Sequence, residues 1–230
     1  MHRIFAIGDI HGCAKTLDFL LTSEIKLKKK DHLVFLGDYI DRGPDSKAVT
    51  DIILNLIRSG YSIRCLRGNH EQMMLDSTLD EYDYDFWISS CGGSATMLSF
   101  GVPDFDSLEL RYQTFFKNLH YYAEIGKYIF VHAALNFSNE NLFEDKQAML
   151  WNRETKIDFQ KLNDRYIIHG HTPNSIQKIR QQFADFEKRR LLCIDGGCVY
   201  HDARMPGYLV SVELTNRSLF VVENIDAIND

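Results

Sequence analysis

The sequence predicts a mixed α/β fold, and three observations support this prediction. Roughly the first seventy residues alternate between short β-branched runs and segments with helical spacing. Most of the second half carries short strand-like runs separated by turn residues. The composition, with 45% hydrophobic and 25% charged residues, is typical of a folded globular chain. At 230 residues the chain can bury a substantial core without disulfides.

The elements of the first part follow directly from this alternation. Short apolar runs predict strands, and apolar residues that recur every three or four positions predict helices. The strands are expected at Ile4–Ile7, Leu33–Leu36 and Tyr61–Leu66, and the helices at Ala14–Glu24 and Ser46–Ser59. Strand, helix, strand, helix and strand joined by short linkers are typical of a right-handed parallel unit.

The remaining elements are less regular. The segment Glu71–Asn118 is expected to be helical, with breaks at Cys91–Gly93 and Gly101–Pro103. A hairpin is expected from His120–Glu124 and Tyr128–Val131. Further strands are expected at Arg165–Ile168, Ile176–Ile179, Leu191–Ile194, Tyr208–Glu213 and Ser218–Val222, and short helices near Glu140–Leu150 and Asp158–Asn163. Because no linker is long enough to separate two units, we expect residues 1–230 to form a single domain.

Charge and cysteine content limit the partners and the compartment. The formal net charge is -6, and an acidic balance argues against nucleic acid or anionic membrane as a partner, because both need clustered cations. At first sight the acidic net charge also argues against a role in phosphate chemistry, because phosphate groups are negatively charged. Five scattered cysteines without a C-x-x-C spacing predict reduced thiols in a cytoplasmic protein. No apolar stretch is long enough to span a bilayer.

Side chains that can bind metal follow five of the predicted strands. Three strands end in glycine followed by Asp, Asn and His, and two later strands end in histidine. The segments are Gly8–Gly12, Gly37–Gly43, Arg67–Glu71, Phe130–His132 and Ile168–His171. Each segment alone is explained better by a turn, a helix cap or a core histidine. The coincidence of five at strand ends, where α/β sheets bind their ligands, predicts one convergent pocket.

These segments resemble the motif series of the metallophosphoesterase (calcineurin-like) superfamily. G-D-x-H-G, G-D-x-x-D-R-G and G-N-H-E occur in order, and the resemblance extends from Ile4 to about Cys198. Within the superfamily the chain resembles the phosphoprotein phosphatases, and most closely the short bacterial and phage serine/threonine phosphatases. The resemblance implies two mixed β-sheets packed as a sandwich and flanked by helices, with the metal site at the carboxyl edge of the strands.

The resemblance also implies a dinuclear metal site. It assigns one divalent ion to Asp9, His11 and Asp38 and a second to Asp38, Asn69, His132 and His171, so that Asp38 bridges the pair. Mixed imidazole, carboxylate and amide ligands suit Mn²⁺, Fe or Zn²⁺ better than Ca²⁺, and of these we expect Mn²⁺. Two divalent ions carry more positive charge than Asp9 and Asp38 neutralise, so the site would attract a phosphate dianion despite the acidic chain.

The same family pattern assigns the remaining roles. His70 protonates the leaving oxygen, Asp41 orients the His70 ring, and Glu71 orients a ligand from behind. The phosphate-binding arginines would be Arg42, Arg67 and Arg153, whose guanidinium groups can bind phosphate oxygens in bidentate fashion.

Two departures from the pattern qualify this assignment. Ala134 stands where many family members carry glycine, and Pro173 stands where the wider superfamily has a further histidine ligand. The first metal should therefore have fewer protein ligands. His169 has no assigned place, and we expect it either to support a metal ligand from behind or to have a structural role.

Three classes of function remain open. The leading hypothesis is a phosphatase that removes phosphate from phosphoserine or phosphothreonine, and also from phosphotyrosine, by attack of a metal-bridging hydroxide. The second is a dinucleoside polyphosphate hydrolase acting on substrates such as diadenosine tetraphosphate, because those enzymes share the motifs. The third, a non-catalytic adaptor, is disfavoured because all ligand positions and His70 are present. The aromatic run Tyr82–Trp87 does not reveal an adenine pocket, and the oligomeric state cannot be inferred.

Overall fold

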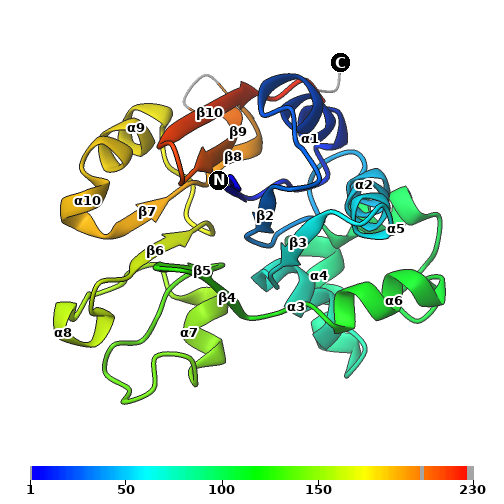
Figure 1. The fold of residues 1–230 in the computed structure, drawn as a ribbon. Helices are drawn as coiled ribbons and strands as arrows, with labels where there is room; N and C mark the ends of the chain where they lie inside the picture. The colour runs from blue at the N-terminus through cyan, green and yellow to red at the C-terminus, as the bar shows by residue number, and fades with distance from the viewer. Residues whose placement is uncertain (1, 203–204, 227–230) are drawn as a thin grey trace.

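Two mixed β-sheets lie against each other and carry helices on their outer faces (Figure 1). The computed structural model describes residues 2–202 and 205–226. The helical segments are α1 Ala14–Phe19, η1 Leu20–Glu24, α2 Ser46–Arg58, α3 Asn69–Asp76, α4 Glu81–Ser90, α5 Gly93–Phe100, α6 Leu110–Lys117, α7 Lys146–Trp151, α8 Phe159–Leu162, α9 Ile176–Ala184 and α10 Phe186–Arg189. The strands are β1 Ile4–Ile7, β2 His32–Phe35, β3 Ser62–Cys65, β4 Tyr122–Ile125, β5 Tyr128–Val131, β6 Tyr166–His169, β7 Leu191–Cys193, β8 Gly196–Asp202, β9 Met205–Glu213 and β10 Ser218–Glu223.

The first sheet has the strand order β10-β9-β1-β2-β3, and β8 pairs with β9 beside this path. β1, β2 and β3 run parallel, as the alternating pattern predicts, while β9 is antiparallel to both β1 and β10. The second sheet has the order β4-β5-β6-β7. Its β4–β5 hairpin is antiparallel and its other pairings are parallel. The predicted two mixed sheets with flanking helices are confirmed.

The period of two along each strand explains how the layers pack. Phe5 and Ile7 of β1 point into a core shared with the first six helices, whereas Ala6 between them points into a core shared with the second sheet. In β5, Phe130 joins this inter-sheet core, while Ile129 packs outward against residues of α7 and α8. Alternate residues therefore bury both faces of each sheet, which requires helices on the outside.

One predicted strand is wrong. Ile176–Ile179 forms the first turn of α9, because the Ser175 hydroxyl accepts a hydrogen bond from the backbone N–H of Lys178 and caps a helix. The apolar residues at positions 176, 179 and 183 then lie on one helical face, against the inter-sheet core. β8 is not among the strands that the sequence predicts.

The glycine breaks in the helical middle are confirmed at both places. Gly92 precedes α5 with φ 93°, and Gly101 follows it with φ 69°. Both angles lie in the left-handed region that favours glycine. None of the helices in the described part of the chain has the length and apolar character needed to cross a bilayer.

Candidate active site

The carboxyl ends of the parallel strands meet in one place, and the loops that follow them interlock. The backbone N–H groups of Ile10 and His11 both donate to the carbonyl of Asp38, at 3.0 and 2.9 Å. The N–H of Gly170 donates to the carbonyl of His132, at 2.8 Å, and so joins the loop after β6 to the loop after β5. The metal-capable side chains of both sheets are therefore held by backbone contacts between loops that are distant in sequence.

The backbone of these loops is unusual. His11, Asp38, Asp41, Arg42 and His171 all have positive φ angles, between 47° and 73°. Non-glycine residues rarely adopt this region, and such conformations concentrate at functional sites because the surrounding structure must enforce them. The glycines in the same loops allow close approach: a side chain on Gly68 would overlap the Asp38 carboxylate. The strand-end segments are thus shaped for one specific side-chain arrangement.

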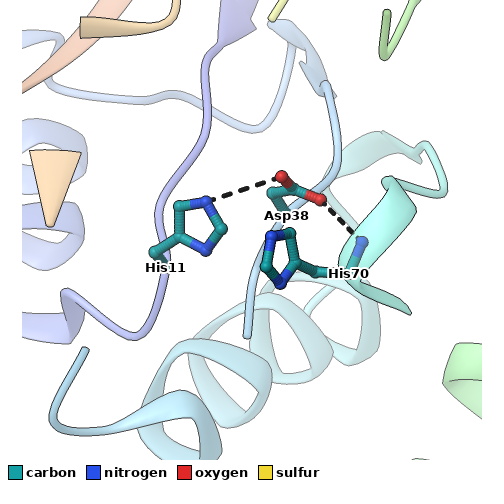
Figure 2. A group of neighbouring side chains, drawn as sticks. All are labelled: His11, Asp38 and His70. Carbon is teal, nitrogen blue, oxygen red and sulfur yellow. Dashed lines mark hydrogen bonds and ion pairs between the residues drawn. The ribbon is translucent and has the colours of Figure 1, made fainter. Parts of the chain in front are cut away.

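Asp38 lies at the centre of this arrangement (Figure 2). Its Oδ2 atom lies 3.5 Å from His11 Nε2, and its Oδ1 atom accepts a hydrogen bond from the backbone N–H of His70 at 3.1 Å. On the other side, Oδ1 lies 3.6 Å from His132 Nε2. Asp38 therefore faces both groups of donor atoms, as expected for a carboxylate shared by two ions.

Two groups of donor atoms are close enough to hold an ion each. One consists of His11, Asp38 and His70, and the other of Asp38, His132 and His171, with the ligand atoms of each group within 4.8 Å of one another. The Asn69 oxygen joins the second group, at 3.0 Å from His132 Nε2 and 2.9 Å from His171 Nδ1. The second group matches the predicted second metal. The first group contains His70 beside His11 and Asp38, whereas Asp9, which the sequence assigns to the first metal, lines the same cavity but does not belong to this group.

The imidazoles are prepared to bind cations. The Nδ1 atoms of His11 and His132 lie 2.8 and 3.0 Å from the carbonyls of Ile40 and Leu36, so those nitrogens carry the proton and the Nε2 lone pairs face the donor groups. Burial lowers the pKa of His11 to about 3 and that of His171 to about 4. Burial also lowers the pKa of His132. Neutral imidazoles with inward lone pairs are what a metal site requires.

The carboxylates also fit a cationic guest. Burial, the charge of Asp195 and the charge of Asp38 raise the pKa of Asp9 well above its ordinary value. Burial raises the pKa of Asp195 to about 7, against a hydrogen bond from the Gly197 N–H. For Asp38 burial acts in the same direction, but neighbouring imidazoles, among them that of His70 with its raised pKa, outweigh it and hold the pKa of Asp38 below the usual range. Positive charge in the cavity would lower the pKa values of Asp9 and Asp195 and so favour their ionisation beside Asp38.

Glu71 fixes the loop that carries Asp38. Its carboxylate accepts the backbone N–H groups of Asp38, Tyr39 and Gly68 at 2.9, 2.8 and 2.9 Å. Burial and the charge of Asp38 raise its pKa to about 8. Glu71 lies behind the Asp38 loop, where the sequence predicts a residue that orients a ligand.

His70 and Asp41 form a close pair beside the metal-capable groups. The Nδ1 atom of His70 donates to Asp41 Oδ2 at 2.7 Å, and both side chains are buried. Burial alone would lower the pKa of His70, but the charge of Asp38 and the hydrogen bond to Asp41 raise it. The arrangement suits an imidazole that must hold a proton and deliver it from a fixed position.

The three predicted phosphate-binding arginines lie in different environments. Arg42 reaches over the site and donates to the Nε2 atoms of His70 and His11, at 2.8 and 3.1 Å. Arg153 lines the same cavity and is exposed. The structure does not bring Arg67 to them.

Arg67 is turned away from the cavity. Its guanidinium donates to the side chains of Gln72 and Tyr121 and to the carbonyl of Lys117, at 2.9, 3.2 and 2.9 Å. It is also largely buried, with an exposed fraction of 9%. In this arrangement Arg67 joins α3 and α6 to the segment before β4.

The cavity is small and polar, with a volume of about 100 Å³. Its walls are Asp9, His11, Asp38, Arg42, Asn69, His70, Arg153, His171, Pro173, Asp195, Gly197 and Tyr200. His132 and Asp41 lie directly behind these walls, in contact with Asn69 and His70. Ten of the eleven predicted site residues thus gather at one place. His169 is buried beside them, with Nδ1 3.1 Å from the carbonyl of Gly170, and it belongs to neither donor group.

Sequence reasoning missed four residues at this site. Asp195 and Tyr200 line the cavity, and Trp87 and Thr96 hydrogen-bond to Asp41. Asp195 could have been found, because Asp-Gly after an apolar strand repeats the pattern of the other strand ends. For Trp87 and Thr96 no local pattern in the sequence indicates the contact.

Comparison with known proteins agrees with this geometry. The calcineurin-like phosphoesterase family profile matches residues 2–201. Serine/threonine-protein phosphatase 1 of Salmonella typhimurium is 37% identical over 97 residues, which are 42% of this chain and 42% of that relative. The symmetrical bis(5'-nucleosyl)-tetraphosphatase of Acidovorax sp. is 39% identical over 72 residues, which are 31% of this chain and 25% of that relative. The matched segments span less than half of the length of these relatives.

Similarity in three dimensions extends much further along the chain. A solved structure described as that of a candidate diadenosine tetraphosphatase has a TM-score of 0.66 at 20% identity, and the match covers 98% of this chain and 95% of that one. At this identity the similarity shows the fold and leaves the substrate open. Together with the profile match over residues 2–201, it shows that the chain belongs to the calcineurin-like phosphoesterase family.

Proposed function

We propose that this protein is a metal-dependent phosphatase that hydrolyses phosphomonoesters, with phosphoserine and phosphothreonine in proteins as its substrates and phosphotyrosine as a further one. The observation that carries the proposal is the His70–Asp41 pair, joined at 2.7 Å beside two groups of metal-capable donors. A binding module would have no need of a buried, oriented proton donor next to those donors.

Asp9, His11 and Asp38 would hold one divalent ion, and Asp38, Asn69, His132 and His171 the other, with Mn²⁺ as the proposed metal. When bound, two such ions neutralise phosphate charge and lower the pKa of a water molecule between them. The chain contributes the neutral imidazoles and the shared carboxylate described above. The placement of His70 beside His11 and Asp38 leaves it close to where the leaving oxygen of a bound phosphoester would lie.

Arg42 would change partners when substrate binds. In the structure its two terminal nitrogens donate to Nε2 of His11 and of His70, so each of these imidazole nitrogens acts as an acceptor. A phosphate dianion is a stronger acceptor for a guanidinium than a neutral imidazole is. A cation held by His11 would already displace Arg42 from His11 Nε2, and transfer of Arg42 to the phosphate would then let His70 Nε2 carry the proton for the leaving group. Arg153 would bind the phosphate from the exposed side.

The alternative substrate is a dinucleoside polyphosphate such as diadenosine tetraphosphate. Relatives with this name match the chain at identities similar to that of the phosphoprotein phosphatase. The cavity of about 100 Å³ is too small to enclose a whole dinucleoside polyphosphate or a phosphopeptide. Either kind of substrate would therefore leave its remaining parts on the surface outside the cavity.

A direct comparison of substrates tests the proposal. Protein reconstituted with Mn²⁺ is assayed in parallel on phosphoserine, phosphothreonine and phosphotyrosine peptides and on diadenosine tetraphosphate. We expect the phosphopeptides to have the higher kcat/KM. A preference for the nucleotide of about a hundredfold or more would replace the leading assignment by the alternative. No turnover of either class by metal-loaded protein would remove both.

A further inference from the structure

Asp41 has a complete set of partners inside the protein. Its Oδ2 atom accepts from His70 Nδ1 at 2.7 Å and from the indole N–H of Trp87 at 2.8 Å, and its Oδ1 atom accepts from the Thr96 hydroxyl at 2.6 Å. Its backbone N–H donates to the Thr96 and Ser46 hydroxyl oxygens at 2.8 and 3.2 Å. Asp41, Trp87 and Thr96 are all fully buried. The carboxylate is thus held from three directions with no room to rotate.

The two additional donors come from the helical corner between α4 and α5. Trp87 lies near the end of α4 and Thr96 lies in α5; Cys91 and Gly92 connect the two helices, and Gly93 begins α5. A Cβ on Gly93 would lie 2.5 Å from the indole ring, so glycine lets the ring lie flat against the backbone. The carbonyl of Gly92 accepts the backbone N–H of Arg42, at 3.3 Å. The corner therefore holds the Asp41–Arg42 segment as well as the carboxylate.

The contacts of Asp41 also fix the orientation of the His70 ring. A histidine that hydrogen-bonds to a carboxylate takes its ring orientation from that carboxylate. Asp41 has a strained backbone, with φ 73°, so contacts from elsewhere must keep it in place. Trp87 and Thr96 are neutral donors, so they hold the carboxylate in place and leave its net negative charge unchanged.

We propose that Trp87 and Thr96 are positioning residues for proton delivery to the leaving group: through Asp41 they fix the direction in which His70 presents its Nε2 proton. The inference rests on the proposed function, in which His70 is the proton donor. Misplacement of a catalytic group by a fraction of an ångström slows only steps that need that group. Loss of either donor should therefore slow hydrolysis where the leaving oxygen must be protonated, and leave other steps nearly unchanged.

A comparison of leaving groups separates this effect from general damage. Phenyl phosphate has a poor leaving group that needs protonation, whereas 2,4-dinitrophenyl phosphate has a good one that does not. The wild type and the variants His70→Asn, Trp87→Phe and Thr96→Val are assayed on both with saturating Mn²⁺. For His70→Asn we expect kcat to fall by about 10²- to 10⁴-fold on phenyl phosphate. For Trp87→Phe and Thr96→Val we expect a fall of about tenfold on phenyl phosphate. On 2,4-dinitrophenyl phosphate all three should stay within about threefold of wild type.

Two controls belong to the experiment. Thr96→Ser keeps the hydroxyl, so its kcat on phenyl phosphate should be close to that of the wild type and well above that of Thr96→Val. Thr50→Val removes another fully buried hydroxyl, one that donates to the carbonyl of Ser46, and should show no dependence on the leaving group. A readout independent of turnover is the low-field ¹H NMR signal of the His70 Nδ1 proton in the metal-free protein. Thr96→Val should shift or broaden this signal and Thr50→Val should not.

The outcomes distinguish the inference from the function on which it rests. One outcome is that His70→Asn lowers kcat more on phenyl phosphate than on 2,4-dinitrophenyl phosphate while Trp87→Phe and Thr96→Val, like Thr50→Val, show no such difference. In that case the positioning role is wrong and the phosphatase mechanism stands. If His70→Asn lowers kcat equally on both substrates, His70 is not the proton donor, and both its proposed role and the positioning role of Trp87 and Thr96 are wrong.

Discussion

At the scale of single residues, Asp38 connects more of the site than any other side chain described above. Its carboxylate faces His11 on one side and His132 on the other, and its backbone N–H is held by Glu71. The left-handed backbone, with φ 51°, aims the side chain between the two donor groups. An amide at this position would keep the shape but lose the negative charge that two cations would share.

We therefore predict that Asp38→Asn binds less Mn²⁺ than the wild type and loses most phosphatase activity. Isothermal titration calorimetry on metal-free protein measures the stoichiometry and affinity directly. Asp18→Asn, a change at an exposed aspartate of α1, serves as the control and should bind Mn²⁺ normally. An Asp38→Asn protein with full metal content and full turnover would contradict the bridging role.

The arginines allow a second prediction at this scale. Arg42 faces the cavity, so Arg42→Ala should raise KM for a phosphopeptide by about tenfold or more while the fold stays intact. Arg67 donates to three acceptors away from the cavity, so Arg67→Ala should mainly lower Tm, by several degrees. Steady-state kinetics and thermal melts on the same preparations compare the two. An increase in KM for Arg67→Ala equal to that for Arg42→Ala would show that Arg67 turns toward the phosphate in solution.

At the scale of elements, the contrast between α2 and α9 is instructive. The apolar stripe in the Ser46–Ser59 segment predicts α2, and Val49 and Ile53 of that stripe are fully buried. The segment Ile176–Ile179 has two isoleucines three residues apart, and a window of four residues does not separate a strand from a helix. The deciding signals are Ser175, which caps the helix, and the next apolar residue one turn further on.

The cap gives a prediction for α9. Ser175→Ala should lower the free energy of unfolding by about 1 kcal/mol, because the N–H of Lys178 loses its acceptor. Ser175→Asn keeps an acceptor and should be close to wild type. Urea denaturation followed by circular dichroism measures both. Equal stability of the alanine and asparagine variants would mean that the cap contributes nothing.

At the scale of the whole molecule, the buried charges of the site make stability depend on pH and on metal. Burial raises the pKa of Asp195 to about 7 and that of Glu71 to about 8 in the metal-free protein. These groups bind protons more tightly when folded than when unfolded, so their contribution to stability is lost as pH rises through these values. His11 and His171, with pKa values lowered by burial to about 3 and about 4, act in the opposite sense. Their contribution is complete above the ordinary histidine value of 6.5 and is lost as pH falls.

The two trends oppose each other below pH 6.5, and above it only the loss from the carboxyl groups remains, so metal-free protein should become less stable from pH 6.5 toward pH 8. A divalent cation stabilises ionised carboxylates and neutral imidazoles, so Mn²⁺ should raise Tm more at pH 8 than at pH 6. Differential scanning calorimetry with EDTA or with Mn²⁺ across this range tests the prediction. An identical increase in Tm at every pH would show that these groups do not respond to the metal.

The acidic net charge of -6 takes on a narrower meaning at this scale. It remains an argument against a partner that coats a wide surface, such as nucleic acid or an anionic membrane, and we propose neither as a partner. It does not oppose phosphate chemistry, because Asp9, Asp38 and Asp195 line the cavity instead of adding to the surface charge. We also propose that residues 1–230 act as a single domain in the cytoplasm; both statements remain predictions.

Much of the fold and of the site could be predicted from the sequence because the information is local. The continuous apolar runs of β1 and β5 indicate two buried faces, and glycine with Asp, Asn or His after a strand marks the edge where loops converge. Ten of the eleven predicted site residues gather there for this reason. The motif order alone was enough to indicate the family.

What the sequence could not determine depends on contacts between distant segments. Trp87 and Thr96 reach Asp41 across 46 and 55 residues, and only the packing of α4 and α5 brings their donors to that carboxylate. Arg67 occupies a position that the family pattern assigns to phosphate binding. Acceptors on Gln72, Tyr121 and Lys117 nevertheless direct its guanidinium away from the cavity. The sequence by itself determined which groups can do the chemistry, because residue type and spacing along a strand are local properties. The tertiary structure decided which of them face one another, because a buried polar group points to whichever partner the packing of the chain supplies.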